Sequence, residues 1–275
     1  MEFLSFAFVW RALIAGALIA IVTAVLGLFL VLKRLSLIGD SLSHVALSGV
    51  ALGLLTNTSP IFVAIPVVMA SSLGIFKITK HTKVYTDSAL GIVSATGIAA
   101  GLIIAALAGG FNIDLFSFLF GSILTVSWAE LVLAAVLTLL SLAIIYVFYN
   151  DLIAIVFDEN FATTAGVNTE RINTILVLIS AAVVVIALRV VGIMLVSAML
   201  IVPPVAALQL AVNFKRALIL ACVFSIIGVV SGIYLSFAFN LPSGASIIIV
   251  DLFILVICAL IKKYAFKKRK LTASN

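Results

Sequence analysis

Long apolar runs separated by short polar interruptions fill most of the 275-residue chain. A bilayer core of roughly 30 Å requires about 20 apolar residues in an α-helix. The runs do not alternate apolar and polar positions, which excludes the strands of an outer-membrane barrel. The pattern therefore predicts an all-α, polytopic membrane protein of about 8–9 transmembrane helices, with residues 1–275 forming a single transmembrane domain. The predicted runs are 9–32, 36–55, 60–76, 87–108, 127–149, 173–188, 190–212, 217–238 and 244–261.

The stretch 173–212 is the least regular part of this pattern. Arg189 and Gly192 interrupt it, and Pro203 and Pro204 follow within the next apolar run. Two consecutive prolines remove two backbone donors, so we expect them to break the helix. One of the nine runs is therefore expected to be something other than a full span, and this stretch is its expected place.

Charged residues predict how the chain is oriented. They make up 9% of the chain, whereas about a quarter of the residues of a soluble protein are charged. Basic side chains gather in every second interruption, and positive residues favour the cytoplasmic side. The N-terminus is then outside, and of the basic residues only Arg11 and Arg189 do not fall on the cytoplasmic side. The net charge of +6 is explained by this topology, so no nucleic-acid partner is expected. The cytoplasmic groups are 33–34, 77–83, 171, 215–216 and the tail 262–275, which is suited to contact anionic membrane lipid.

Several absent or isolated features restrict the function. No GxxxxGK[ST] loop is present, so any ATP that drives transport must bind to another polypeptide. Cys222 and Cys258 lie in apolar runs without metal-ligand spacing and are interpreted as packing residues. Neither His44 nor His81 lies in an HExxH motif, which argues against a membrane metalloprotease. The first run carries no cleavage site and is expected to be retained in the membrane.

The segment GDSLSHVALSG at 39–49 places Asp40 and His44 one helical turn apart on the same face. A carboxylate and a neutral imidazole are ligands for a divalent transition metal. An unpaired aspartate in a membrane costs roughly 2.5–3.5 kcal/mol, which indicates a function or a partner. Spacing alone also allows a purely structural arrangement, with hydrogen bonds between the two side chains or to Ser41, Ser43 and Ser48.

The polar segment FDENFATTAGVN at 157–168 predicts a short cytoplasmic helix that ends at Gly166. On one helix, Phe157, Phe161 and Ala165 would form an apolar stripe. An ordinary solvated connector is the alternative. In the membrane, Asp251 is expected to pair with a neighbouring helix, and Arg189 either reaches the outer surface or forms an ion pair.

Six stretches together resemble the permease subunits of bacterial zinc and manganese ABC importers, the ABC-3 family. The longest, LKRLSLIGDSLSHVALSGVALGLL, resembles the second-helix signature of these proteins. The other five occur in the order found in the family, so the resemblance covers nearly the whole chain. They are YTDSALGIV at 85–93, DLFSFLFGSIL at 114–124, FDENFATTAGVN at 157–168, VGIMLVSAMLIVPPVAA at 191–207 and FNLPSGASIII at 239–249.

The resemblance implies a transport subunit with ABC importer permease architecture and no enzymatic activity of its own. Asp40 and His44 would coordinate the transported ion, which is cargo rather than a permanently bound cofactor. The loop at about 150–172 would dock on the ATPase. The coupling residues implied there are Phe157, Asp158, Glu159, Phe161, Ala165 and Gly166. The implied partners are a cytoplasmic ATP-binding subunit, an extracellular metal-binding protein and a second copy of the permease.

Zinc is the favoured ion, with manganese or iron as alternatives. The Irving–Williams order favours zinc over manganese at equal geometry. The resemblance adds that Ser48 stands where many manganese permeases carry proline. An ion-coupled secondary transporter is a further alternative, but it would be expected to carry more intramembrane carboxylates and an internal repeat, which this sequence lacks.

Overall fold

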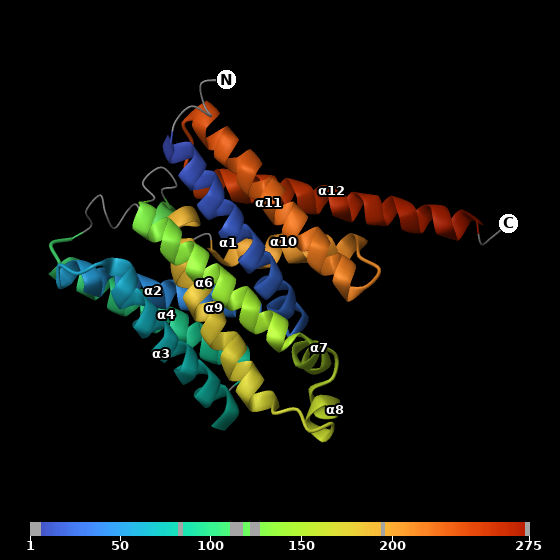
Figure 1. Ribbon diagram of the computed structural model, residues 1–275, viewed down its shortest axis with the longest axis horizontal. Coiled ribbons are helices and arrows are strands. Elements are labelled where there is room, and N and C mark those ends of the chain that lie inside the picture. The colour runs from blue at the N-terminus through green and yellow to red at the C-terminus, as the bar shows by residue number, and fades with distance from the viewer. Residues whose placement is uncertain (1–6, 82–84, 111–117, 122–126, 194–195, 273–275) are drawn as a thin grey trace.

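The computed structural model describes residues 7–81, 85–110, 118–121, 127–193 and 196–272, which form helices packed side by side (Figure 1). The helices are α1 (Ala7–Leu32), α2 (Ile38–Leu55), α3 (Pro60–His81), α4 (Thr86–Leu107), α6 (Trp128–Val147), α7 (Tyr149–Phe157), α8 (Glu159–Thr164), α9 (Thr169–Val191), α10 (Val196–Leu210), α11 (Phe214–Phe239) and α12 (Ser243–Thr272).

Within the described ranges, eight helices are long and apolar enough to cross a membrane, and each corresponds to a predicted run. The ninth run, 190–212, contains α10, a shorter apolar helix of 15 residues (Val196–Leu210). The prediction of one shorter segment between 173 and 212 is therefore confirmed. Large apolar side chains such as Leu139 of α6 and Phe253 of α12 are exposed, as expected for helices that face lipid.

Pro203 and Pro204 do not break α10, so that expectation is wrong. Both prolines lie inside the continuous helix Val196–Leu210. The carbonyls of Met199 and Leu200, four residues earlier, lose their usual helical donors. The Leu200 carbonyl lies against Gly27 of α1, where an added Cβ would be 1.9 Å from its oxygen. Packing of α10 between α1, α11 and α12 holds the helix together despite the missing bonds.

Contacts at the helix ends show that α10 connects opposite ends of the bundle. Phe214, at the start of α11, packs against Phe29 near the end of α1, with ring centroids 5.3 Å apart. Asn173, near the start of α9, bonds to Glu159 of α8, which also contacts Lys33 just after α1. Both α9 and α11 therefore begin at the same end. The short α10 must return the chain between them.

We call this end of the bundle the basic end, because the lysine- and arginine-rich interruptions meet there. Lys33 contacts α8, and Lys77 of α3 lines a cavity with Glu170 of α9. Lys262 of α12 donates to Gln209 near the end of α10, at 3.1 Å. Arg11 lies towards the start of α1, where its guanidinium stacks over Trp128, 5.9 Å from the ring centroid. The predicted segregation of charge to one end is thus present in the fold.

Helix α2 is packed closely against α3 and α4 through small residues. Gly49 faces the backbone of Ala64 in α3, and Gly97 of α4 faces the peptide between His44 and Val45. Ser48 Oγ donates a hydrogen bond to the Gly97 carbonyl at 2.7 Å. Small residues allow helix backbones to approach in a membrane, and this packing fixes the rotation of α2.

Asp251 and Arg189 differ in how far the structure describes them. The Asp251 side chain is 2% exposed and lies against Gly228 of α11. Among the described residues, neither of its carboxylate oxygens has a hydrogen-bond partner. The expected contact with a neighbouring helix is present, but the expected polar pairing is wrong, because the surface it meets is bare glycine backbone. Arg189 lies in the last turn of α9, and its side chain is outside the described part of the chain.

Candidate functional site

Asp40 and His44 lie together on one face of α2, as predicted. His44 Nε2 is 3.6 Å from Asp40 Oδ1, and the side chains are 20% and 43% exposed respectively. The nearby serines do not bond to either side chain. Ser41 Oγ donates to the Leu90 carbonyl and Ser43 Oγ to the Asp40 carbonyl, so both hydroxyls are held by backbone. The carboxylate and the imidazole therefore keep ligand atoms for an incoming cation.

This pair alone does not complete a metal coordination shell. The described residues contain no cluster of three or more His, Cys, Asp and Glu side chains arranged to hold a metal. Two ligands leave positions for water or for groups brought in by movement of the helices. An open shell suits a transported ion, which must be released as well as bound. Metal coordination by Asp40 and His44 stays a prediction.

The pair also has a defined position along α2. Asp40 and His44 are the third and seventh residues of the helix, which begins at Ile38 directly after the turn that follows Lys33. With a rise of about 1.5 Å per residue, they lie about 3 and 9 Å along the helix axis from its first residue. The pair is therefore in the part of α2 nearest the basic end.

The segment between α6 and α9 forms two short helices instead of the single predicted one. Helix α7 ends at Phe157, and Asp158 adopts an extended backbone conformation before α8 begins. The Asp158 side chain accepts a hydrogen bond from the Phe161 amide at 2.9 Å, which caps α8. The predicted end at Gly166 agrees with its positive φ of 89°. The break at Asp158 puts Phe157 at the end of α7 and Phe161 in α8, so the predicted stripe of Phe157, Phe161 and Ala165 on one helix is wrong.

Two large aromatic side chains are exposed on this segment. Phe157 and Phe161 are 71% and 66% exposed. Ala165, further along the same segment, is also exposed. Ala162, in contrast, is completely buried and fixes α8 to the rest of the chain. Exposed aromatic groups outside the apolar spans are typical of a surface that binds another protein.

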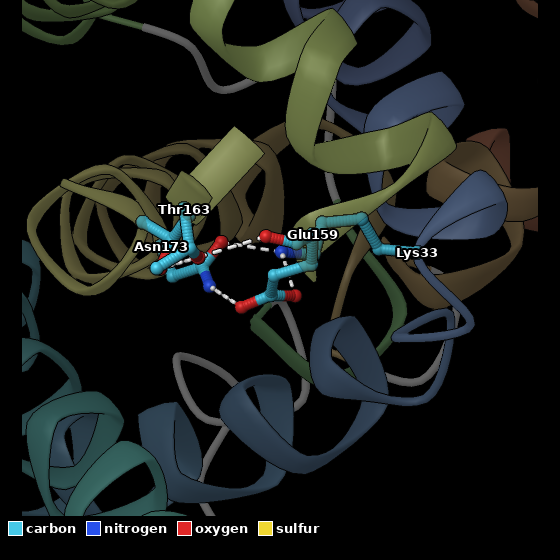
Figure 2. Close-up of polar contacts among 5 residues, drawn as sticks. Lys33, Glu159, Thr163 and Asn173 are labelled. Carbon is cyan, nitrogen blue, oxygen red and sulfur yellow. Dashed lines mark hydrogen bonds and ion pairs between the residues drawn. The ribbon is translucent and has the colours of Figure 1, made fainter. Parts of the chain in front are cut away.

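A closed set of polar contacts ties α8 to α1 and α9 (Figure 2). Lys33 Nζ lies 3.5 Å from Glu159 Oε2 and donates a hydrogen bond to Asn173 Oδ1. The Asn173 amide donates in turn to Glu159 Oε1 at 2.8 Å. Burial lowers the pKa of Lys33, and the Glu159 carboxylate opposes this by stabilising the charged amine. We call these three residues the polar triangle.

Sequence reasoning identified Glu159 but missed Lys33 and Asn173 as its partners. Lys33 was assigned only to the positive side of the membrane, and no motif marked Asn173. Glu159 and Asn173 lie 126 and 140 residues after Lys33 in the chain, so no local spacing could reveal these contacts.

A cavity of about 450 Å³ lies next to the polar triangle. The triangle forms one part of its lining, together with residues from the start of α9. Leu35, Phe76 of α3 and Thr86 of α4 form another part. At the basic end, the cavity therefore lies between α8 and the ends of α3 and α4.

The model of the ABC 3 transport family matches residues 5–262. The chain belongs to this family. As a family member it is a membrane-spanning transport subunit and not an enzyme, which confirms the resemblance identified in the sequence. The eight candidate spans found among the described residues agree with a multi-pass location in the cell membrane.

Individual ABC 3 relatives match over most of the chain. "Manganese transport system membrane protein MntC" of Halalkalibacterium halodurans is 34% identical over 90% of this chain and 85% of its own length. "High-affinity zinc uptake system membrane protein ZnuB" of Haemophilus influenzae is 25% identical over 92% of this chain and 97% of its own length. A solved structure titled "PsaBC from Streptococcus pneumoniae in complex with Fab" has a TM-score of 0.85 at 30% identity, covering 94% of this chain and 92% of that one. The predicted permease architecture is thus confirmed.

Proposed function

We propose that this chain is the permease subunit of an ATP-driven importer of a divalent transition metal. The observation that carries the proposal is the Asp40–His44 pair, with carboxylate and imidazole 3.6 Å apart on the tightly packed helix α2. Among known ligand types, this combination suits a first-row divalent metal. Relatives named for manganese and zinc transport support the same class of cargo.

The charge distribution supports an orientation with the basic end in the cytoplasm. The N-terminus is then outside and the C-terminus inside. Helices α7 and α8 reach the cytoplasm, where Phe157 and Phe161 would bind a separate ATP-binding subunit. The ion would arrive at the opposite end from an extracellular metal-binding protein. A second copy of the chain would complete the translocation path, with lipid around the remaining apolar surface.

We propose manganese or zinc as the ion, and the preference for zinc stays a prediction. The manganese-named relative is 34% identical to this chain and the zinc-named relative 25%, which favours manganese. The Ser48 side chain gives no structural reason to prefer zinc, because its hydroxyl donates a hydrogen bond to the Gly97 carbonyl. A competition between the two ions in the uptake assay distinguishes them directly.

The proposal is tested by metal uptake in cells that lack their own importers and express this chain with its ATP-binding partner. Asp40→Ala and His44→Ala are each expected to abolish uptake while the protein remains in the membrane. Asp87→Ala is the control, because Asp87 is an exposed acid in the first turn of α4. Normal uptake by both site variants would refute metal coordination by this pair. Uptake that continues after ATP depletion would refute the ATP-driven mechanism.

A further inference from the structure

The polar triangle joins three elements that are far apart in the sequence. Lys33 is the first residue after α1, Glu159 is the first residue of α8, and Asn173 is the fifth residue of α9. Each carboxylate oxygen of Glu159 has a different partner, and Asn173 uses both its amide nitrogen and its amide oxygen. Figure 2 shows the three side chains meeting at one point between these elements.

The burial of Lys33 makes the triangle difficult to open. Its side chain is 7% exposed, whereas that of Glu159 is 50% exposed. A buried ammonium without a partner is costly, so separating Glu159 from Lys33 would leave an uncompensated charge. Hydrogen bonds to charged groups are also stronger than those between neutral groups. Movement of Glu159 is therefore expected to take Lys33 and Asn173 with it.

Helix α8 also packs against α7, the helix that precedes it in the chain. It is only six residues long, and Ala162 is its buried residue. Thr163 makes a further contact with Thr169 at the start of α9, with hydroxyl oxygens 3.3 Å apart. The cavity of about 450 Å³ lies beside Glu159, towards α3 and α4. In the described part of the chain, α8 thus packs on α7 and is tied by polar side chains to α9 and to Lys33 after α1, with open space towards α3 and α4.

The two helices held by the triangle lead to the candidate metal site. Helices α1 and α9 pack against each other, and α9 also packs against α2, which carries Asp40 and His44. A force applied to α8 would therefore reach α2 through α9. The cavity leaves room for α8 to shift relative to α3 and α4 without a direct collision.

We propose that Lys33, Glu159 and Asn173 are positioning residues that transmit movement of α8 to α1 and α9, and thereby couple the ATP-binding partner to the metal path. This inference rests on the proposed function. It assigns the transmission to a defined set of contacts, separate from the exposed aromatic groups that would bind the partner.

The first test is Asn173→Asp in the purified complex with the ATP-binding subunit, reconstituted in lipid vesicles. The substitution keeps the side-chain shape but replaces the NH₂ donor by an oxygen that repels Glu159. The subunit is expected to remain bound and to hydrolyse ATP. Metal transported per ATP should fall by about tenfold, the factor associated with losing a hydrogen bond to a charged group.

Asn213→Asp provides a matched control for this variant. Asn213 caps α11 at the basic end by accepting a hydrogen bond from the Arg216 amide at 2.9 Å. Aspartate caps helices as well as asparagine does, so the same chemical change is tolerated there. This variant should transport the wild-type amount of metal per ATP.

The second test exchanges the charges of the triangle. Lys33→Glu and Glu159→Lys should each uncouple transport, because each places like charges together. The double variant should recover coupling, since the Asn173 amide can turn over, accept from the new lysine and donate to the new glutamate. If the single variants failed because each destabilised the protein in general, their losses would add in the double variant. Recovery of coupling in the double variant therefore identifies the specific contact between the two side chains.

The outcomes separate this inference from the proposed function. Wild-type complex is measured first, and a lack of ATP-dependent metal uptake there would overturn the proposed function itself. With wild-type uptake established, the inference is overturned if Asn173→Asp transports metal at the wild-type ratio per ATP. It is also overturned if the double charge exchange is as impaired as the single variants. All ratios of metal transported per ATP are measured on monodisperse complex, so a lower yield of folded protein does not change the ratio of a variant.

Discussion

Replacing Gly97 by alanine should force α4 away from α2 beside the candidate metal site. A Cβ at Gly97 would lie 2.8 Å from the Val45 amide nitrogen and 2.9 Å from the His44 carbonyl carbon. Both are backbone atoms and cannot rotate away. Carbon atoms in contact normally lie about 3.5–4.0 Å apart, so the helices would have to separate by roughly 0.5 Å or more. The Ser48–Gly97 hydrogen bond lies at the same contact and would be stretched.

The size of the effect follows from comparing two glycines on the same helix. Gly91, also in α4, is exposed and has nothing within 4 Å of an added Cβ. Alanine should favour the helix at both positions by roughly 0.5–1 kcal/mol. The clash arises only at Gly97, where overpacking costs about 1–3 kcal/mol. The difference between Gly97→Ala and Gly91→Ala therefore isolates the clash and should be about 1–3 kcal/mol.

Unfolding of the purified permease and its metal affinity would be measured for both variants. Gly97→Ala should unfold at a lower temperature than Gly91→Ala and should bind metal more weakly, because the displaced peptide belongs to His44. Gly91→Ala should bind metal like the wild type. If the two variants were equally stable, the close α2–α4 contact at His44 would not exist as described.

Two further substitutions test other parts of the fold. Phe161→Asp should remove the ATP-binding subunit from the purified complex without changing metal binding, because it places a charge on the exposed aromatic surface; a full complement of bound subunit would show that α8 is not the docking element. Gly228→Ala should destabilise the permease by about 1–3 kcal/mol, since its Cβ would overlap the buried Asp251 side chain, 1.8 Å from Oδ1. In an Asp251→Ala background the same change should cost much less, and an equal cost in both backgrounds, measured by thermal unfolding, would show that Asp251 is not the obstacle.

The sequence by itself determined the spans and the distribution of charge. Apolar length is enough to define a membrane helix, because each helix satisfies its own backbone hydrogen bonds in the bilayer. The run at 36–55 accordingly became α2, Ile38–Leu55. Local spacing also placed Asp40 and His44 on one face, because residues four apart in a helix are neighbours. The end of α8 just before Gly166 could also be predicted from the local sequence, because glycine readily adopts positive φ.

Only the tertiary structure decided how these elements contact one another. Pro203 and Pro204 looked like a break, but α10 remains helical because neighbouring helices enclose it. Asp251 was expected to find a polar partner and instead faces the glycine surface of α11. The polar triangle depends on Lys33 and Asn173 meeting across 140 residues, and a pairing of that range depends on the packing of whole helices. Periodicity reports which face of a helix is apolar, but the partner of that face is set by close packing in three dimensions.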